Sequence, residues 1–184
     1  MPSARRAAKP RVLYSRRRIA RRVREIAREV DRAYRGRPFT ICGVLTGGAV
    51  FAADLARAVR NDRVELDFVK ASSYGAGTVS SGRVVLSILD RGGIAGKDVL
   101  VVEDICESGR TLEQVVRGLR VCGARTVRTA VLLVKPGKRV ADHEPDWVGF
   151  TMREDAFVAG YGLDAGRRYR NLPDIVVPPV RARR

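Results

Sequence analysis

The chain has 184 residues, of which 45% are hydrophobic and 30% charged, and its formal net charge is +16. This length suits one domain with a hydrophobic core of its own, and the composition excludes global disorder. No apolar run approaches the roughly 20 residues that a transmembrane helix needs, and the charged N-terminus argues against a secretory signal. We therefore expect a cytoplasmic protein without a membrane span; an Arg-rich organellar leader is the less favoured alternative.

The basic residues gather at the two ends of the chain. Residues 1–37 hold 14 Lys and Arg against three acidic residues, residues 181–184 add three Arg, and residues 38–180 carry a net charge of only +2. We expect a mobile basic arm at 1–11, a single domain at 12–180 and a basic tail at 181–184. Polyanion contact through the basic ends is one interpretation, and a general preference for Arg at exposed positions is the other.

Cysteine and histidine are too few for several kinds of site. Cys42, Cys106 and Cys122 are odd in number and share no metal-ligand spacing, and His143 is the only histidine. This excludes a disulfide framework, a His-dependent triad and a multi-His metal site.

Strand and helix patterns alternate along the chain. A helix begins after the capping residue Ser15 and is stopped by Gly36 and Pro38. After it we expect strands at 39–45, 64–70, 83–89, 98–104 and 126–135, helices at 49–59 and 111–121, a long loop at 72–82, and short strands and turns to 179. This order predicts an α/β fold: an open, mostly parallel, twisted sheet flanked by helices. Ligands then bind at the carboxyl ends of the strands, just after Leu45, Asp104 and Lys135.

The strongest local pattern is VLVVEDICESGRTL at residues 99–112. A buried strand ends in two adjacent carboxylates, Glu103 and Asp104, and a loop with Ser108 and Gly109 leads into a helix at Thr111. Loop N–H groups, hydroxyls and a helix N-terminus make an anion site, whereas the two acids suit ribose hydroxyls or Mg²⁺. The pattern favours a sugar phosphate as the ligand. An ordinary strand-loop-helix with polar ends is the alternative.

This segment resembles the phosphoribosyl-pyrophosphate signature of the type I phosphoribosyltransferases. From about Ile19 to Ile175 the chain is similar to the hypoxanthine-guanine phosphoribosyltransferase family in particular. The similar segments are KASSYGAG at 70–77 (a lid), VLTGGAVFAADL at 44–55 (a pyrophosphate loop), LLVKPGKRV at 132–140 and DWVGF at 146–150 (a purine pocket), and the closing segment at 154–175. The resemblance implies a sheet with a small hood subdomain. It also implies a Mg²⁺-dependent reaction of a purine base with phosphoribosyl pyrophosphate, giving the nucleoside monophosphate and pyrophosphate.

The resemblance implies roles for the residues that bind phosphoribosyl pyrophosphate. Glu103 and Asp104 hold the ribose hydroxyls and the metal, and Asp155 binds a second Mg²⁺ through water. The remaining contacts are shared among the 5′-phosphate loop (Ser108, Gly109, Arg110, Thr111), the pyrophosphate loop (Thr46, Gly47), a charged clamp (Arg139) and the lid (Ser73, Tyr74).

The resemblance also implies how the purine is held. Trp147 stacks on the ring, Lys135 donates to O6, and the Val148 backbone reads the Watson–Crick edge. A core aromatic is the alternative for Trp147, and a surface lysine is the alternative for Lys135. Glu107 takes the proton from purine N7.

Three departures from the family pattern bear on function. Glu107 stands where the family usually has Asp, Thr46 where it has Lys or Arg, and one residue is inserted near 153–155. The added methylene of Glu107 allows a slower enzyme, a repositioned loop or another role. Two further hypotheses stay open: a regulator that keeps the fold and binds nucleic acid, and a transferase for xanthine. The family resemblance implies a homodimer or homotetramer.

Overall fold

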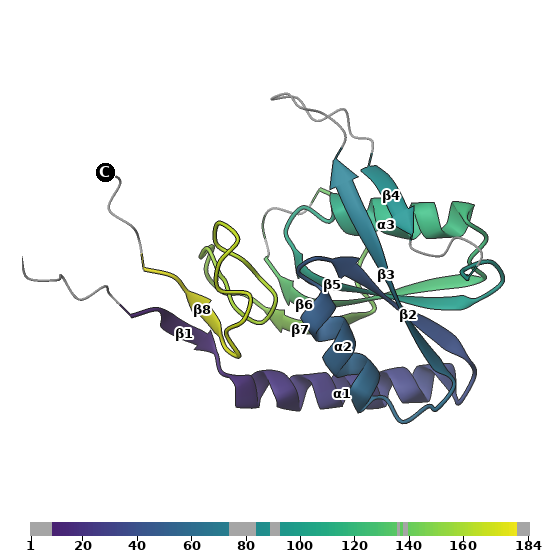
Figure 1. Cartoon of the computed structure of the whole chain (residues 1–184), viewed down its shortest axis with the longest axis horizontal. Coiled ribbons are helices and arrows are strands. Elements are labelled where there is room, and N and C mark those ends of the chain that lie inside the picture. The colour runs from purple at the N-terminus through teal and green to yellow at the C-terminus, as the bar shows by residue number, and fades with distance from the viewer. Residues whose placement is uncertain (1–8, 74–83, 89–92, 136, 138–139, 180–184) are drawn as a thin grey trace, which may run out of the picture.

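The computed structural model describes residues 9–73, 84–88, 93–135, 137 and 140–179, and Figure 1 shows how their elements are arranged. Eleven elements follow one another in chain order: β1 Arg11–Tyr14, α1 Arg16–Tyr34, β2 Phe39–Leu45, α2 Ala49–Ala58, β3 Val64–Ser73, β4 Val84–Ile88, β5 Asp98–Cys106, α3 Arg110–Val121, β6 Thr126–Val134, β7 Trp147–Thr151 and β8 Ile175–Val177. No helix among these residues is long and apolar enough to cross a membrane.

Six strands form the main sheet, in the order β4-β3-β2-β5-β6-β7. Strands β3, β2, β5, β6 and β7 are parallel, and only the edge strand β4 runs antiparallel to its neighbour. Helices α1 and α2 cover one face and α3 covers the other (Figure 1). The expected mostly parallel α/β sheet is therefore confirmed.

Helix α1 has the bounds that its sequence predicts. The Ser15 hydroxyl accepts a hydrogen bond from the backbone N–H of Arg18 at 3.5 Å, which satisfies one of the free donors of the first turn. Arg35 ends the helix in the left-handed conformation, with a φ of 50°. Six apolar residues on one side of α1 are buried: Ile19, Val23, Ile26, Ala27, Val30 and Tyr34.

The core has one layer on each face of the sheet. Alternate residues of β5 point to opposite faces. Leu100 and Val102 pack with the buried sides of α1 and α2, whereas Val99 and Val101 pack with α3. A strand buried on both faces reads as a continuous apolar run, which is why β5 was easy to predict.

A second, two-stranded sheet joins the two ends of the chain. Strands β1 and β8 pair antiparallel, with Arg11 opposite Val177. This pair adjoins the carboxyl end of β7, since Arg11 Nη2 lies 2.6 Å from Glu154 Oε1 and Tyr14 stacks on Phe150 at 4.2 Å. It supplies the small subdomain that we expected. Strand β1 was not predicted, and Arg11, which we assigned to the mobile arm, is its first residue; residues 1–8 and 180–184 lie outside the described chain.

Asp98 connects β5 to the start of β6 at the amino-terminal edge of the main sheet. Its carboxylate accepts hydrogen bonds from Arg125 at 2.7 and 2.9 Å and from the Thr126 hydroxyl at 2.7 Å, and its side chain is only 2% exposed. These bonds favour the charged form and lower the pKa of Asp98 from 3.8 to about 2.

We expect this carboxylate to make folding sensitive to acid. The pKa is lower in the folded chain, so the stabilisation is complete above about pH 4 and is lost as the pH falls toward 2. The loss is about 2 kcal/mol, because one pKa unit corresponds to about 1.4 kcal/mol. Urea unfolding between pH 2 and pH 6 measures it, with Asp98→Asn as the control. Equal pH dependence in the two proteins would contradict this assignment.

Candidate active site

Three loops meet at the carboxyl edge of the main sheet. Strands β2, β5 and β6 are parallel neighbours, so the loops that follow Leu45, Cys106 and Val134 leave the sheet side by side. Side chains from segments about 90 residues apart in the sequence are brought together in this way. The position that the sequence predicted for ligand binding is therefore a real convergence of loops.

The loop after β5 surrounds a small cavity and leads into α3. The cavity has a volume of about 180 Å³ and is lined by eight residues: Glu103, Ile105, Cys106, Glu107, Ser108, Gly109, Thr111 and Leu112. Gly109 is the capping residue of α3, with a φ of +80° that side chains rarely adopt, and as a glycine it offers the helix no side-chain acceptor. The first-turn N–H groups can therefore bind a phosphate. Arg110 is exposed, and its backbone N–H lies 3.4 Å from the Ser108 hydroxyl.

The two carboxylates at the end of β5 differ in their surroundings. Glu103 is 8% exposed, and its Oε2 is buried without a hydrogen-bond partner among the described residues. Burial, and the neighbouring Asp104, raise the pKa of Glu103 well above its usual value. A ribose hydroxyl or a bound cation would supply the interaction that Oε2 lacks.

This pair fits Mg²⁺ as a cofactor. The described residues include no group of three or more His, Cys, Asp or Glu that could hold a metal ion. Mg²⁺ often binds through one or two carboxylates together with waters and substrate phosphates, so a pair of acids beside a phosphate loop is sufficient. Glu103 and Asp104 are the residues that would hold it.

The loop after β2 lies against the acid pair. The Leu45–Thr46 peptide bond is cis, and Gly47 is so close to Asp104 that a Cβ added to Gly47 would lie 1.7 Å from Asp104 Oδ2. Gly162 of the closing segment approaches from the other side, where an added Cβ would lie 2.3 Å from the Gly47 carbonyl oxygen. The predicted pyrophosphate loop is thus in contact with the predicted ribose site.

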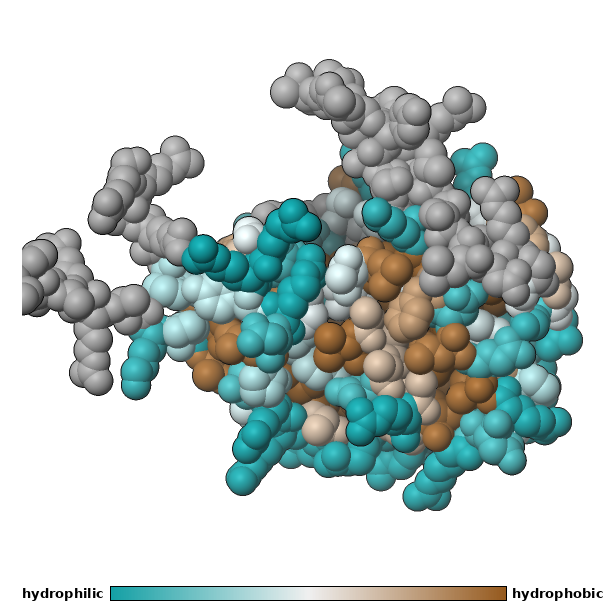
Figure 2. Space-filling model, in the orientation of Figure 1, coloured by the Kyte–Doolittle hydropathy of each residue, from teal (hydrophilic) through white to brown (hydrophobic). Residues whose placement is uncertain are grey.

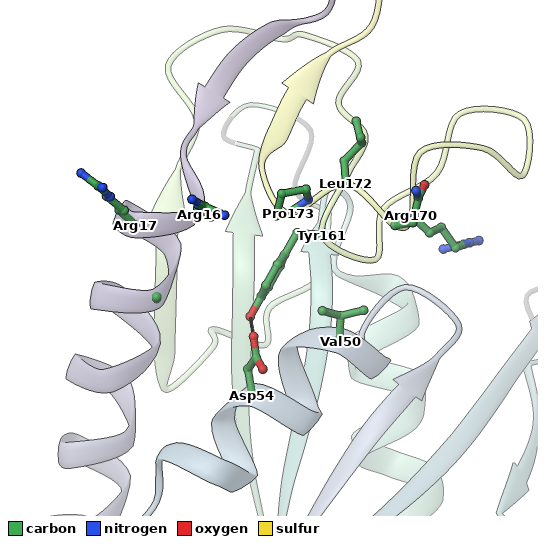
Figure 3. Close-up of a pocket in the computed structure, with 10 residues that line it drawn as sticks. Arg16, Arg17, Val50, Asp54, Tyr161, Arg170, Leu172 and Pro173 are labelled. Carbon is green, nitrogen blue, oxygen red and sulfur yellow. Dashed lines mark hydrogen bonds between the residues drawn. The ribbon is translucent and has the colours of Figure 1, made fainter.

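A hydrogen bond fastens the closing segment to α2. The Tyr161 hydroxyl donates to Asp54 Oδ2 at 2.8 Å, beside a mainly apolar cavity of about 570 Å³ (Figure 3). Burial and this bond raise the pKa of Tyr161, so the hydroxyl stays protonated as the donor. The segment is therefore held over the start of α2, next to the pyrophosphate loop.

Lys135 lies at the centre of the remaining predicted residues. It is only 6% exposed, and its Nζ lies 2.6 Å from Glu107 Oε1 and 3.7 Å from Asp155 Oδ1. A surface lysine is excluded by this burial. The structure therefore brings together the predicted hydrogen-bond donor to O6 and the predicted proton acceptor, and it places Asp155 beside them.

Trp147 and Val148 are not at this edge, which corrects the prediction for the base pocket. In the parallel pairing of β6 and β7, Trp147 lies opposite Ala130, five residues before Lys135, or about 16 Å along the strand. Trp147 is 9% exposed and belongs to the core, which is the alternative we kept for it. The Val148 carbonyl accepts a hydrogen bond from Arg22 of α1 at 2.8 Å.

The structure offers an aromatic side chain that the sequence analysis missed. Phe157 is 62% exposed and follows β7 at its carboxyl end, two residues after Asp155. In the sequence, Phe157 could have been recognised only as an apolar residue of the closing segment that fits neither strand nor helix periodicity. A flat, exposed ring at this edge is suited to stacking on a base.

A second missed feature is an acid–arginine pair in the closing segment. Asp164 Oδ1 lies 2.7 Å from Arg170 Nη2, and Arg170 Nη1 donates to the Gly162 carbonyl. Gly162 contacts Gly47, so this pair is near the pyrophosphate loop. Asp164 is therefore a further candidate for the metal role that we gave to Asp155.

The remaining predicted residues are described incompletely. Ser73 is the last residue of β3, and its side chain is not described. Tyr74 and Arg139 lie outside the described residues, so their roles stay predictions. Thr46 and Thr111 are at the expected positions in their loops, and Thr111 lines the phosphate cavity.

We expect Gly47→Ala to damage the site and to leave the fold intact. The added methyl group would displace the Asp104 carboxylate, a mobile side-chain end, and weaken binding of phosphoribosyl pyrophosphate with Mg²⁺ by about tenfold, or about 1.4 kcal/mol. Calorimetric titration measures the affinity, and thermal melting measures stability.

Gly48→Ala is the matched control for this prediction. A Cβ on Gly48 would meet the backbone carbonyl oxygens of Val102 and Val44 at 2.8 Å, so this variant should lose stability instead. Unchanged affinity in Gly47→Ala, or equal melting losses in the two variants, would contradict the prediction.

Comparison with known proteins agrees with this geometry. The phosphoribosyl transferase domain model matches residues 12–165. The hypoxanthine-guanine phosphoribosyltransferase of Bacillus subtilis is 43% identical over 167 residues, which are 90% of this chain and 91% of that protein. The bifunctional protein TilS/HprT of Listeria monocytogenes is 44% identical over 164 residues, and the match covers 89% of this chain and a quarter (25%) of that longer protein.

A solved structure gives the same result. The crystal structure of a hypoxanthine-guanine phosphoribosyltransferase from Bacillus anthracis, with HEPES in its active site, is 38% identical with a TM-score of 0.83; the match covers 94% of this chain and 99% of that one. A domain match over most of the chain and relatives above 30% identity agree on one family. The chain belongs to the phosphoribosyl transferase domain family, within its hypoxanthine-guanine phosphoribosyltransferase branch.

Proposed function

We propose that the chain is a purine salvage enzyme. It transfers the 5-phosphoribosyl group from phosphoribosyl pyrophosphate to N9 of hypoxanthine or guanine, giving IMP or GMP and pyrophosphate. The observation that carries this proposal is the ion pair between the buried Lys135 and the exposed Glu107, which lies at the same sheet edge as the acid pair and the cavity after β5. A protein that only bound phosphoribosyl pyrophosphate would have no need of a buried lysine beside a carboxylate.

The loops divide the binding of the sugar phosphate between them. The N–H groups at the start of α3 and the Ser108 and Thr111 hydroxyls hold the 5′-phosphate. Glu103 and Asp104 bind the ribose hydroxyls, and the backbone at Thr46 and Gly47 holds the pyrophosphate. Mg²⁺, when bound, neutralises charge on the pyrophosphate as it leaves.

Lys135 and Glu107 act on the base. Lys135 donates a hydrogen bond to O6, an acceptor that adenine lacks at this position. The Glu107 carboxylate accepts the N7 proton as N9 attacks the anomeric carbon and pyrophosphate departs. Phe157 takes the stacking role that Trp147 cannot fill, since among the described residues it is an exposed aromatic at this edge.

The position of the Glu107 carboxylate supports its proposed role as the general base, although its side chain is one methylene longer than aspartate. Its extra methylene relative to aspartate brings Oε1 to 2.6 Å from Lys135 Nζ. A carboxylate that contacts the O6 donor is also within reach of N7, because O6 and N7 are neighbours on the purine edge. This contact supports the proposal that Glu107 acts as the general base.

The experiment that tests this function is a spectrophotometric assay of purified protein with Mg²⁺ and phosphoribosyl pyrophosphate, one base at a time. We expect monophosphate from hypoxanthine or guanine and none from adenine. Glu107→Gln should lower kcat by about 100-fold or more, since positioned general bases contribute at least this much.

Other outcomes of this assay would support the alternatives. Product from xanthine alone would identify the related transferase. No product from any base, together with measurable binding of phosphoribosyl pyrophosphate, would make the nucleic-acid-binding regulator the leading hypothesis.

Phe157→Ala should weaken purine binding without preventing folding, because the ring is exposed. Loss of base–aromatic stacking costs about 1–3 kcal/mol, so KM for hypoxanthine should rise by about 5-fold to 160-fold. Trp147→Phe is the control: it should lower the melting temperature and leave KM unchanged. A larger rise in KM for Trp147→Phe would restore the original assignment.

We also propose a cytoplasmic homodimer or homotetramer. None of the three cysteines, all within the described residues, forms a disulfide, which suits a reducing compartment. The resemblance to the hypoxanthine-guanine phosphoribosyltransferase family supports an assembly of this kind. Sedimentation equilibrium distinguishes the two assemblies.

A further inference from the structure

Five arginines form a continuous ridge on the outer side of α1. The arginine ridge consists of Arg17, Arg21, Arg24, Arg28 and Arg32, spaced three or four residues apart, and all five are exposed. At 100° per residue they lie within a narrow sector that is opposite the buried side of the helix. The ridge extends over about 22 Å, at a rise of 1.5 Å per residue.

The arginine ridge lies at the margin of the molecule. Helix α1 is the outermost element on its side of the sheet (Figure 1), and hydrophilic side chains cover this margin (Figure 2). The ridge is therefore accessible to a large ligand.

The acidic residues of α1 leave most of the positive charge of the ridge without a neutralising partner. Glu25 and Glu29 lie 3.1 and 3.4 Å from Arg22, which is not in the ridge. The Asp31 carboxylate accepts the backbone N–H groups of Arg60 and Asn61.

Among the described residues, one member of the ridge forms a salt bridge. Arg21 lies 3.9 Å from Glu25, a long contact, and within the described part of the chain the other four members form no salt bridge. Four or five guanidinium groups are thus available along one line.

We propose that the arginine ridge binds the phosphate backbone of double-stranded nucleic acid, without sequence preference. Guanidinium groups bind phosphate oxygens in pairs, and a row of them can follow a backbone. A projecting helical ridge also fits a groove, because the major groove of B-DNA is about 12 Å wide and admits an α-helix. This surface is separate from the proposed active site and does not depend on the proposed catalysis.

Two other partners fit the ridge less well. A helix that lies on a membrane inserts an apolar side into the lipid, whereas the apolar side of α1 is buried in the core. Non-specific single-strand binding uses aromatic rings that stack on bases, and the ridge has none.

Salt dependence provides the quantitative test. Each phosphate contact contributes about −0.9 to the slope of log K against log salt, so five contacts give a slope near −4.5. Affinity for a 20-base-pair duplex should then fall by about 500-fold between 50 and 200 mM salt. Fluorescence anisotropy measures this with the full chain, in Mg²⁺ and excess inorganic pyrophosphate to fill the phosphate sites of the active centre.

Two double variants that remove the same charge distinguish binding by the arginine ridge from a general effect of net charge. In the double variant Arg24→Gln, Arg28→Gln, the affinity for duplex should fall by only about 40-fold between 50 and 200 mM salt, because two phosphate contacts are removed. Arg117→Gln with Arg120→Gln removes the same charge from exposed positions on α3, across the sheet, and should change nothing. Circular dichroism checks that both variants are folded.

The proposal fails under any of three results. These are no binding to duplex at 50 mM salt, equal weakening by the two double variants, or tighter binding to vesicles of anionic phospholipid than to duplex. Intact hypoxanthine conversion in the ridge variant should accompany weakened duplex binding, and this keeps the proposal distinct from the enzymatic one.

Discussion

A carboxylate oxygen buried at the end of β5 is the constraint around which the site is built. Glu103 Oε2 has no hydrogen-bond partner among the described residues, and burial raises the pKa of this side chain. Such an arrangement costs folding free energy, because a buried polar atom loses its water and gains nothing. The parallel strands tolerate it because their apolar packing on both faces holds β5 in place. A ligand that supplies the missing interaction therefore binds a site that is already formed.

The ion pair between Lys135 and Glu107 has a second consequence for binding. Under the proposed function, a purine whose O6 accepts from Lys135 must compete with the Glu107 carboxylate, whose Oε1 lies 2.6 Å from the lysine Nζ. The purine also brings a proton at N7 that Glu107 can accept, so the exchange replaces one interaction with two. Under the proposed function, this discriminates against a base that lacks the oxo group, because an amino group in its place cannot accept the hydrogen bond from Lys135.

The sequence predicts local helices and strands well, but it predicts poorly which distant segments lie next to one another. Helix α1 and strand β5 were predictable because periodicity and continuous burial are local properties. Strand β1 was missed because its four residues pair with β8, more than 160 positions away. Trp147 was misplaced for a similar reason: only the register of β7 against β6 decides which end of the sheet it occupies. Phe157 has no local pattern at all, and only its exposure at the correct edge reveals it.

The contact between Gly47 and Gly162 couples the pyrophosphate loop to the closing segment, although the two are far apart in the sequence. No side chain fits between them, so the backbones touch directly, and Tyr161 fastens the same segment to α2 through Asp54. A shift of the pyrophosphate loop must therefore push the closing segment, whose next strand, β8, pairs with β1. Under the proposed function, the site where the leaving group departs is therefore connected by direct backbone contacts to the paired ends of the chain.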